Sequence, residues 1–124
     1  MFQGMGGAVV PVWSAHGEGK FTMPDLQDYK KLVESGLIVA QYADNKGLPT
    51  RDYPDNPNGS PLGIAGVCTW DGRHTAMMPH IERFASNYHI PYIPEEWANI
   101  KNPIWRRCAE NMYVWLVKNN QVSF

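Results

Sequence analysis

The residues of this chain that are best suited to chemistry are a histidine and a glutamate two positions apart. His80 and Glu82 follow an apolar run, and Pro79 stands directly before the histidine. Side chains two positions apart point to the same side of an extended backbone, so Glu82 could orient the His80 imidazole and stabilise its protonated form. The pair predicts the base and the orienting carboxylate of a nucleophilic triad. The alternative is a structural ion pair at a strand end, with Arg83 as a second partner for Glu82.

Neither cysteine has the setting that a catalytic nucleophile requires. A reactive cysteine is exposed and has a depressed pKa, usually at a glycine-flanked turn between a strand and a helix. Cys68 falls inside a predicted strand and Cys108 inside a predicted helix, so both are expected to be small core residues. No serine stands in such a turn either. The triad therefore lacks its nucleophile, and two cysteines without a disulfide framework favour the reducing cytosol.

A second candidate site is the sequence His16-Gly17-Glu18-Gly19, called the glycine loop below, which follows an apolar run. Two glycines let a backbone approach a ligand closely, with its N–H and C=O groups free to bind it. The alternative is a turn whose glycines merely supply positive φ angles.

The composition excludes several other classes of function. With 124 residues, 44% of them apolar and 19% charged, the chain suits one globular domain. A net charge of -1 gives no basic field for nucleic acid or a membrane surface, and the uncharged stretch 1–15 is too short to span a bilayer. The four histidines lack the spacing of a zinc site, and no phosphate-binding loop occurs. We therefore expect no metal, nucleotide, nucleic acid or membrane to bind this segment.

The first half of the chain predicts a strand, a helix and a second strand. The apolar, β-branched run 8–15 indicates a strand that leads into the glycine loop, although Pro11 argues against a central, fully paired position. Thr22, followed by a proline and an acid, is typical of a helix start, and Gly36 is typical of a helix end. The run 37–42 then predicts the second strand. The apolar face of the helix consists of Leu26, Tyr29, Leu32 and Val33.

The second half predicts a hairpin and a terminal helix. The runs 64–70 and 74–78 flank Asp71 and Gly72, a dipeptide typical of a hairpin tip. A short helix is expected near the glutamate of the pair. The last helix is expected to begin at residues 102–103, an asparagine cap followed by proline at the first helical position. Its predicted buried stripe consists of Ile104, Cys108, Met112 and Trp115.

This order of elements suits the second half of an α/β domain better than a complete domain. Three or four strands with one covering helix would leave a sheet face and an edge unprotected. We therefore expect residues 1–124 to form a partial α/β domain with an incomplete sheet, a hairpin and a C-terminal helix.

Several motifs that occur in this order resemble one family. They are Val-Pro-Val-Trp-Ser-Ala-His-Gly-Glu-Gly-Lys-Phe (residues 10–21), Tyr-Pro-x-Asn-Pro-Asn-Gly-Ser-Pro (53–61), Gly-Ile-Ala-Gly-Val-Cys (63–68) and Met-Met-Pro-His-x-Glu-Arg (77–83). In combination they resemble the C-terminal end of the large single-chain phosphoribosylformylglycinamidine synthases of de novo purine synthesis. The resemblance runs from residue 2 to about residue 116, nearly the whole chain.

The resemblance implies a class I glutamine amidotransferase domain of the flavodoxin-like style, of which this chain is expected to be the C-terminal half. In that family a cysteine attacks the glutamine side-chain amide and forms a thioester. The ammonia released travels to a synthetase site, where ATP with Mg²⁺ activates formylglycinamide ribonucleotide for conversion to the amidine. His80 and Glu82 match the family's triad histidine and glutamate, and His16, Gly17 and Glu18 match a segment that lines the glutamine pocket.

Two departures from the family pattern bear on activity. Ile81 stands where the motif has a second proline, which frees φ between the two triad residues. The nucleophile and the synthetase are expected upstream of the first residue of this chain, so the isolated chain is expected to be inactive.

The expected partners are therefore glutamine and the rest of a cytoplasmic synthase chain, with no cofactor held by this segment. The alternative is a non-catalytic half-domain relic that binds a full-length synthase. A free-standing amidotransferase subunit of another pathway is disfavoured by the Asn-Pro-Asn-Gly-Ser-Pro context.

Overall fold

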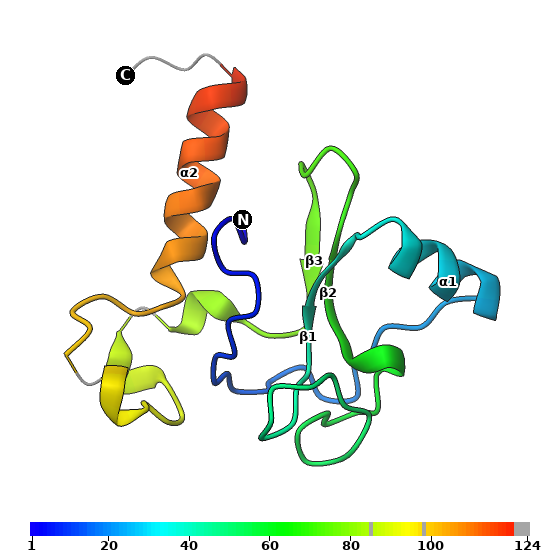
Figure 1. Ribbon diagram of the computed structural model, residues 1–124, viewed down its shortest axis with the longest axis horizontal. Helices are drawn as coiled ribbons and strands as arrows, with labels where there is room; N and C mark the ends of the chain where they lie inside the picture. The colour runs from blue at the N-terminus through cyan, green and yellow to red at the C-terminus, as the bar shows by residue number, and fades with distance from the viewer. Residues whose placement is uncertain (85, 98, 121–124) are drawn as a thin grey trace. The chain divides into compact units, whose positions relative to one another are not determined.

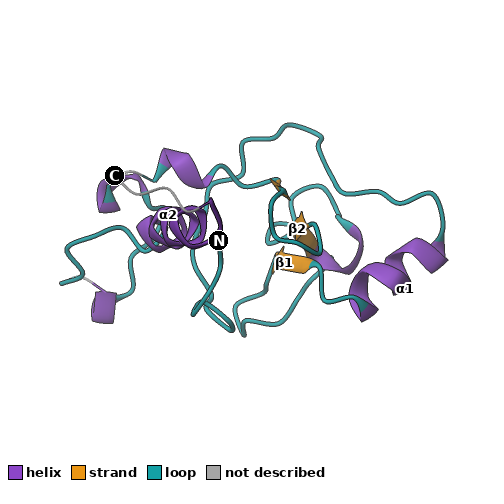
Figure 2. Ribbon diagram, turned by 90° about the horizontal axis from the view of Figure 1, so that it is seen from above, coloured by secondary structure: helices purple, strands orange, loops and turns teal. Residues whose placement is uncertain are grey.

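The computed structural model describes residues 1–84, 86–97 and 99–120 and divides into two compact units. The first unit comprises Met1–Trp13 and His80–Phe124, and the second unit comprises Ser14–Pro79. The three described strands all lie in the second unit, and the described part of the first unit consists of helices and loops (Figures 1 and 2).

The second unit is built on a three-stranded antiparallel sheet in the order β1-β2-β3 (Figure 1). Its strands are β1 (Ile38–Gln41), β2 (Ile64–Cys68) and β3 (Thr75–Met77). The central strand holds the core of this unit, because the side chains of Ile64 and Ala65 are fully buried. The partial α/β fold predicted from the sequence is confirmed, and every described strand pair is antiparallel.

The predicted hairpin is also confirmed. β2 pairs with β3, with Gly66 opposite Met77 and Cys68 opposite Thr75. At its tip the Asp71 carboxylate accepts hydrogen bonds from Thr69 Oγ1 at 2.6 Å and from a backbone N–H two residues on. The Thr69 hydrogen bond in particular lowers the pKa of Asp71 below the usual range.

The helix α1 spans Leu26–Glu34, but its cap differs from the prediction. Asp25, not Thr22, is the N-cap, because its carboxylate accepts the backbone N–H of Asp28 at 3.0 Å. None of the residues of α1 is buried, and Leu26 is 84% exposed. Within the described residues, the apolar face predicted for this helix is only partly covered, since Tyr29 and Leu32 are half-buried while Leu26 and Val33 are exposed.

The strand predicted over residues 8–15 is wrong. This run forms no ladder with any described strand, and it crosses from the first unit into the second after Trp13. In the first unit it is held by side chains instead. The carbonyl oxygen of Pro11 accepts a hydrogen bond from Trp105 Nε1 at 3.3 Å, and Trp13 Nε1 donates to the carbonyl of His89 at 3.1 Å. An apolar β-branched run becomes a strand only where a neighbouring strand accepts its hydrogen bonds.

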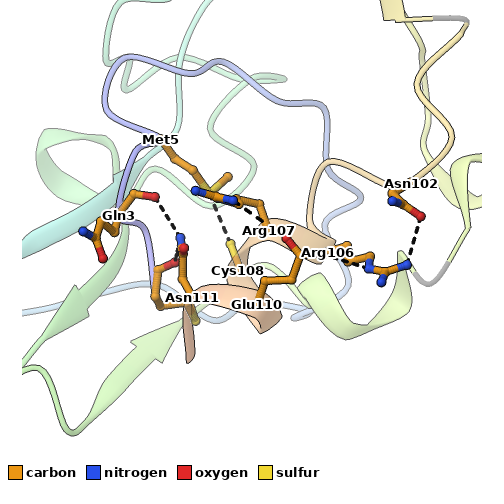
Figure 3. A network of polar contacts seen from close by, with 9 residues as sticks. Gln3, Met5, Asn102, Arg106, Arg107, Cys108, Glu110 and Asn111 are labelled. Carbon is orange, nitrogen blue, oxygen red and sulfur yellow. Dashed lines mark hydrogen bonds and ion pairs between the residues drawn. The ribbon is translucent and has the colours of Figure 1, made fainter. Parts of the chain in front are cut away.

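The first unit is organised around α2 (Arg106–Asn120), against which the N-terminal segment lies (Figure 3). Asn111 Nδ2 donates to the carbonyl oxygens of Met1 and Gln3, both at 2.8 Å, and Cys108 Sγ lies 3.6 Å from Met5 Sδ. Cys108 is fully buried, and this burial raises the pKa of its thiol. The prediction that Cys108 is an unreactive core residue is therefore supported by its environment.

Two details of α2 differ from the prediction. The helix begins at Arg106 and not at residues 102–103, and the Asn102 side chain accepts a hydrogen bond from Arg106 Nη1 at 2.9 Å. In the predicted buried stripe, Met112 is 40% exposed. Its neighbour Asn111 is buried in its place, since the two carbonyl oxygens that it binds satisfy both amide hydrogens.

Gly63 offers a test of the packing around the sheet. Its φ is +68°, and a Cβ there would lie 3.0 Å from the carbonyl oxygens of both Thr50 and Tyr42. Gly36 also has a positive φ, +66°, but nothing lies within 4 Å of the equivalent position. We predict that Gly36→Ala lowers the free energy of unfolding by about 1–2 kcal/mol. Gly63→Ala should lower it by a further ~1–3 kcal/mol from crowding.

Urea denaturation of the two variants beside the unaltered chain measures both free energies. Equal losses for Gly63→Ala and Gly36→Ala would show that the backbone at Gly63 moves away from a side chain without cost.

Candidate functional site

His80 and Glu82 meet in the first unit through a hydrogen bond of 2.6 Å between Nδ1 and Oε1. The backbone that brings them together is not the extended one assumed from the spacing. His80 is the N-cap residue of a single 3₁₀ turn, Ile81–Arg83, and the glutamate lies inside that turn. The predicted contact is therefore present, but a tight turn produces it. Whether the two residues are catalytic stays a prediction.

The pair has a defined electrostatic character. The hydrogen bond from His80 is the main cause that lowers the pKa of Glu82, and the nearby Arg83 charge adds a weaker effect. An ionised carboxylate only accepts hydrogen bonds, so Nδ1 of His80 carries the hydrogen. In the neutral ring Nε2 is then unprotonated, which is the tautomer that a general base requires. No described residue forms a hydrogen bond with this nitrogen.

Glu82 also lines an open groove of the first unit, with a volume of about 690 Å³. The Trp105 and Phe84 rings form part of its wall, with ring centroids 6.2 Å apart. Lys101 and Arg106 add positive charge to the lining. Ile81, the residue at the family's second proline position, lines the same groove.

The glycine loop lies in the second unit, where three side chains meet the His16 imidazole. Ser14 Oγ and Tyr42 Oη each lie 2.9 Å from Nε2, and Asn58 Nδ2 lies 3.1 Å from Nδ1. Tyr42 is only 8% exposed, and burial raises its pKa to about 12. The His16 ring is therefore held on both nitrogens by its own unit.

The same amide of Asn58 binds the backbone of the glycine loop. Its nitrogen lies 2.6 Å from the carbonyl oxygen of Gly17 and 2.9 Å from that of Gly19. Both positions favour glycine, for different reasons. The φ of Gly17 is +58°, while a Cβ at Gly19 would approach the His16 carbonyl to 3.1 Å and Met78 Sδ to 3.3 Å. The turn that the sequence suggested is thus part of a loop whose backbone is bound by Asn58 and is closely packed at Gly19.

Asn58 is itself fixed by the loop that carries it. The buried Asn56 donates to the carbonyl oxygens of Thr50 and Ser60, both at 2.9 Å, and accepts the backbone N–H of Ser60 at 2.9 Å. The hydrogen bonds between Asn56 and Ser60 therefore hold together the chain before and after Asn58. Sequence reasoning missed Tyr42 and Asn58 as site residues. The signal for Asn58 is the Asn-Pro-Asn-Gly-Ser-Pro stretch, which also carries part of the family resemblance.

The predicted site residues thus fall into two groups. His80 and Glu82 are joined in the first unit, and His16, Gly17 and Glu18 share one loop of the second unit. Glu18 is exposed, and its carboxylate has no hydrogen-bond or ion-pair partner among the described residues.

In the described part of the chain, no three histidine, cysteine or acidic side chains gather as a metal site would require. The helices in that part are too short or too polar to cross a membrane.

Comparisons with known proteins bear on the whole chain. A model of the CobB/CobQ-like glutamine amidotransferase domain matches residues 1–116. The chain is 45% identical over 125 residues to phosphoribosylformylglycinamidine synthase of Drosophila melanogaster, an alignment that covers 98% of this chain and 9% of the fly protein. It is 43% identical over 122 residues to the Homo sapiens synthase, covering 97% of this chain and 9% of the human protein.

A plant protein gives the same result. The chain is 43% identical over 119 residues to the probable phosphoribosylformylglycinamidine synthase, chloroplastic/mitochondrial, of Arabidopsis thaliana, covering 94% of this chain and 8% of the plant protein. The chain therefore spans 8–9% of the length of these curated relatives. The family resemblance predicted from the motifs is confirmed.

The buried Tyr42 hydroxyl predicts a specific dependence of stability on pH. Its folded pKa of about 12 lies above the ordinary value of 10.0. Between these values the unfolded chain loses the phenol proton while the folded chain keeps it, so Tyr42 makes stability fall as pH rises. We predict that Tyr42→Phe, which lacks the hydroxyl bonded to His16, is less stable than the unaltered chain by about 1 kcal/mol at pH 8. This difference should shrink above pH 10 and change sign before pH 12, because the gap between the two pKa values is worth more than about 1 kcal/mol.

Urea denaturation of both chains at intervals across this pH range measures the difference, and the exposed Tyr53→Phe serves as the control. Stability curves for Tyr42→Phe and the unaltered chain that stay parallel up to pH 12 would contradict the assignment.

Proposed function

The chain belongs to the CobB/CobQ-like glutamine amidotransferase family. We propose that it is part of a phosphoribosylformylglycinamidine synthase. In that enzyme it supplies the base and the orienting carboxylate of the glutaminase triad. The observation that carries the proposal is the 2.6 Å hydrogen bond between His80 Nδ1 and Glu82 Oε1. It leaves Nε2 of the same ring available as a base.

In the proposed reaction His80 moves a proton twice. Its Nε2 takes the proton of a cysteine thiol that lies outside this chain, and the thiolate sulfur forms a bond to the side-chain amide carbon of glutamine. The carbon–nitrogen bond then breaks as His80 returns the proton to the leaving nitrogen, which departs as ammonia. Water hydrolyses the thioester to glutamate. Glu82 stays ionised, and it stabilises the protonated imidazole at the stage when the ring carries a positive charge.

The glycine loop is proposed to hold the glutamine. Its residues His16, Gly17 and Glu18 lie on a backbone that Asn58 fixes, and the carboxylate of Glu18 is exposed. The rest of a cytoplasmic synthase chain is proposed to supply the cysteine and the site where ATP and Mg²⁺ drive conversion of formylglycinamide ribonucleotide with the released ammonia. No cofactor is assigned to this segment, and alone it should not turn over glutamine.

Ile81 is the feature that favours the second candidate, a non-catalytic half-domain that binds a full-length synthase. The local backbone, however, weakens Ile81 as an argument for a non-catalytic role. Ile81 is the first residue of its 3₁₀ turn, where proline is well tolerated. The preceding residue has φ -94° and ψ 84°, outside the helical region that a following proline disfavours. The backbone before Ile81 and its place at the start of the turn are thus compatible with a proline at this position.

The catalytic assignment predicts the effect of removing the base. In the human synthase, with this chain in place of its aligned stretch, we expect His80→Ala to reduce glutamine-dependent synthesis by a factor of about 10²–10⁴. Synthesis from added ammonium should be unchanged, because it bypasses the thioester. Steady-state kinetics with each nitrogen source measure the two activities, and His89→Ala, an exposed histidine of the same unit, is the control. Parallel loss of both activities would assign a structural role to His80.

The backbone around Ile81 predicts that the family proline can be restored. We expect Ile81→Pro in the same enzyme to leave glutamine-dependent kcat intact and to stabilise the segment by about 0.4–1 kcal/mol, since it restricts the unfolded chain. Kinetics and urea denaturation measure both effects. A large fall in kcat would mean that the turn around His80 changes when proline is present, and that isoleucine is required for its geometry.

A further inference from the structure

Among the described residues, the hydrogen bonds that tie the 53–61 segment to the glycine loop all come from one side-chain amide, that of Asn58. Asn58 Nδ2 lies within 3.1 Å of His16 Nδ1 and of the carbonyl oxygens of Gly17 and Gly19. These contacts cross about forty residues of sequence, since Asn58 and Gly17 are 41 positions apart. Asn58 is therefore the residue outside the loop that binds its backbone carbonyls, while Tyr42 and Ser14 contact only the His16 ring.

The partners of Asn58 decide which way its amide faces. The carbonyl oxygens of Gly17 and Gly19 can only accept hydrogen bonds, and an amide group offers two hydrogens on its nitrogen and none on its oxygen. Turning the amide over would place its oxygen 2.6–2.9 Å from two other oxygens. The network thus requires the nitrogen to face the loop.

The orientation of Asn58 then assigns the His16 ring. The amide nitrogen cannot accept a hydrogen bond, so Nδ1 is the unprotonated nitrogen and shares one of the two amide hydrogens with a loop carbonyl. In the neutral ring Nε2 then carries the hydrogen. That hydrogen is directed towards Tyr42 Oη and Ser14 Oγ, each 2.9 Å away. Both nitrogens of His16 are therefore used inside the second unit, and neither is left to contact a substrate.

Glu18 has the opposite character. It sits between the two carbonyls that Asn58 binds, it is exposed, and none of the described residues pairs with its carboxylate. A glutamine molecule carries one cationic group, the α-ammonium, which a free carboxylate recognises through charge-assisted hydrogen bonds.

We propose that Asn58 is a positioning residue for glutamine. It holds His16 and the loop carbonyls so that Glu18 is presented to the α-ammonium group of the substrate. The inference rests on the proposed glutaminase function, and it changes the role of His16 from a substrate contact to a support of the loop.

The test uses the full-length human synthase that carries this chain in place of its aligned stretch. Two substrates are compared, glutamine and glutaramate, which is glutamine without its α-amino group. The variants are Asn58→Asp, Asn58→Ala and Glu18→Gln, with Asn45→Ala, an exposed turn asparagine of the same unit, as the matched control. Aspartate has the size of asparagine but places a charged oxygen against the two loop carbonyls.

The unaltered enzyme should prefer glutamine over glutaramate in kcat/KM. Glu18→Gln and Asn58→Ala should each reduce this preference by about tenfold through a higher KM for glutamine. Asn58→Asp should reduce it further, and Asn45→Ala should not change it. Activity with ammonium should stay the same in all four.

Several results would overturn the inference. One is a preference for glutamine in Asn58→Asp that equals that of the unaltered enzyme. Another is an equal loss of kcat/KM with glutamine and glutaramate, which a merely structural role of Asn58 would give. The third is the absence of any preference for glutamine in the unaltered enzyme. His80→Ala separates the two proposals. If that variant loses glutamine-dependent synthesis while Asn58→Asp keeps the preference, only the role of Asn58 fails. If His80→Ala keeps full glutamine-dependent synthesis, the glutaminase function and this inference fail together.

Discussion

Carbonyl groups in loops need hydrogen-bond partners, and in this chain asparagine side chains supply many of them. Two of these residues act in the second unit: Asn56 binds the carbonyls of Thr50 and Ser60, and Asn58 binds those of Gly17 and Gly19. In the first unit Asn111 binds the carbonyls of two residues at the N-terminus. A sheet ladder would normally satisfy such groups, but the described sheet has only three strands. The amides therefore set where the long loops lie, and one of these loops carries the candidate substrate residues.

The two histidines of interest differ in the nitrogen that remains available. In His80 the hydrogen is on Nδ1, bonded to Glu82, and no described residue engages Nε2. In His16 the hydrogen is on Nε2, which faces Tyr42, and Nδ1 accepts from Asn58. Only the first arrangement leaves a basic nitrogen for proton transfer. The hydrogen-bond partners of each imidazole ring therefore decide its role: they make His80 a candidate base and make His16 a residue that holds the glycine loop.

Local sequence predicted the features that depend on local contacts. The hairpin around Asp71 and the meeting of His80 with Glu82 are examples, because their partners lie within a few positions. It failed where distant partners decide the outcome. Residues 8–15 have the composition of a strand but bind side chains of the first unit, and Met112 is exposed because its neighbour Asn111 binds carbonyls more than one hundred positions away. The role of Asn58 is hidden in the same way, since its partners are about forty positions earlier.

The dependence on amide donors changes how substitutions in this chain should be judged. Burial of apolar surface has no direction, so a core residue such as Ile64 can be exchanged for another of similar volume at modest cost. A hydrogen bond from an amide to two carbonyls depends on direction and on which atom is the donor. Aspartate at position 58 matches asparagine in size and shape, yet it replaces the donor with a third acceptor. Judged by residue similarity alone, Asn58→Asp is a mild change. Judged by the number of hydrogen-bond donors and acceptors, it is among the substitutions that disrupt the glycine loop most.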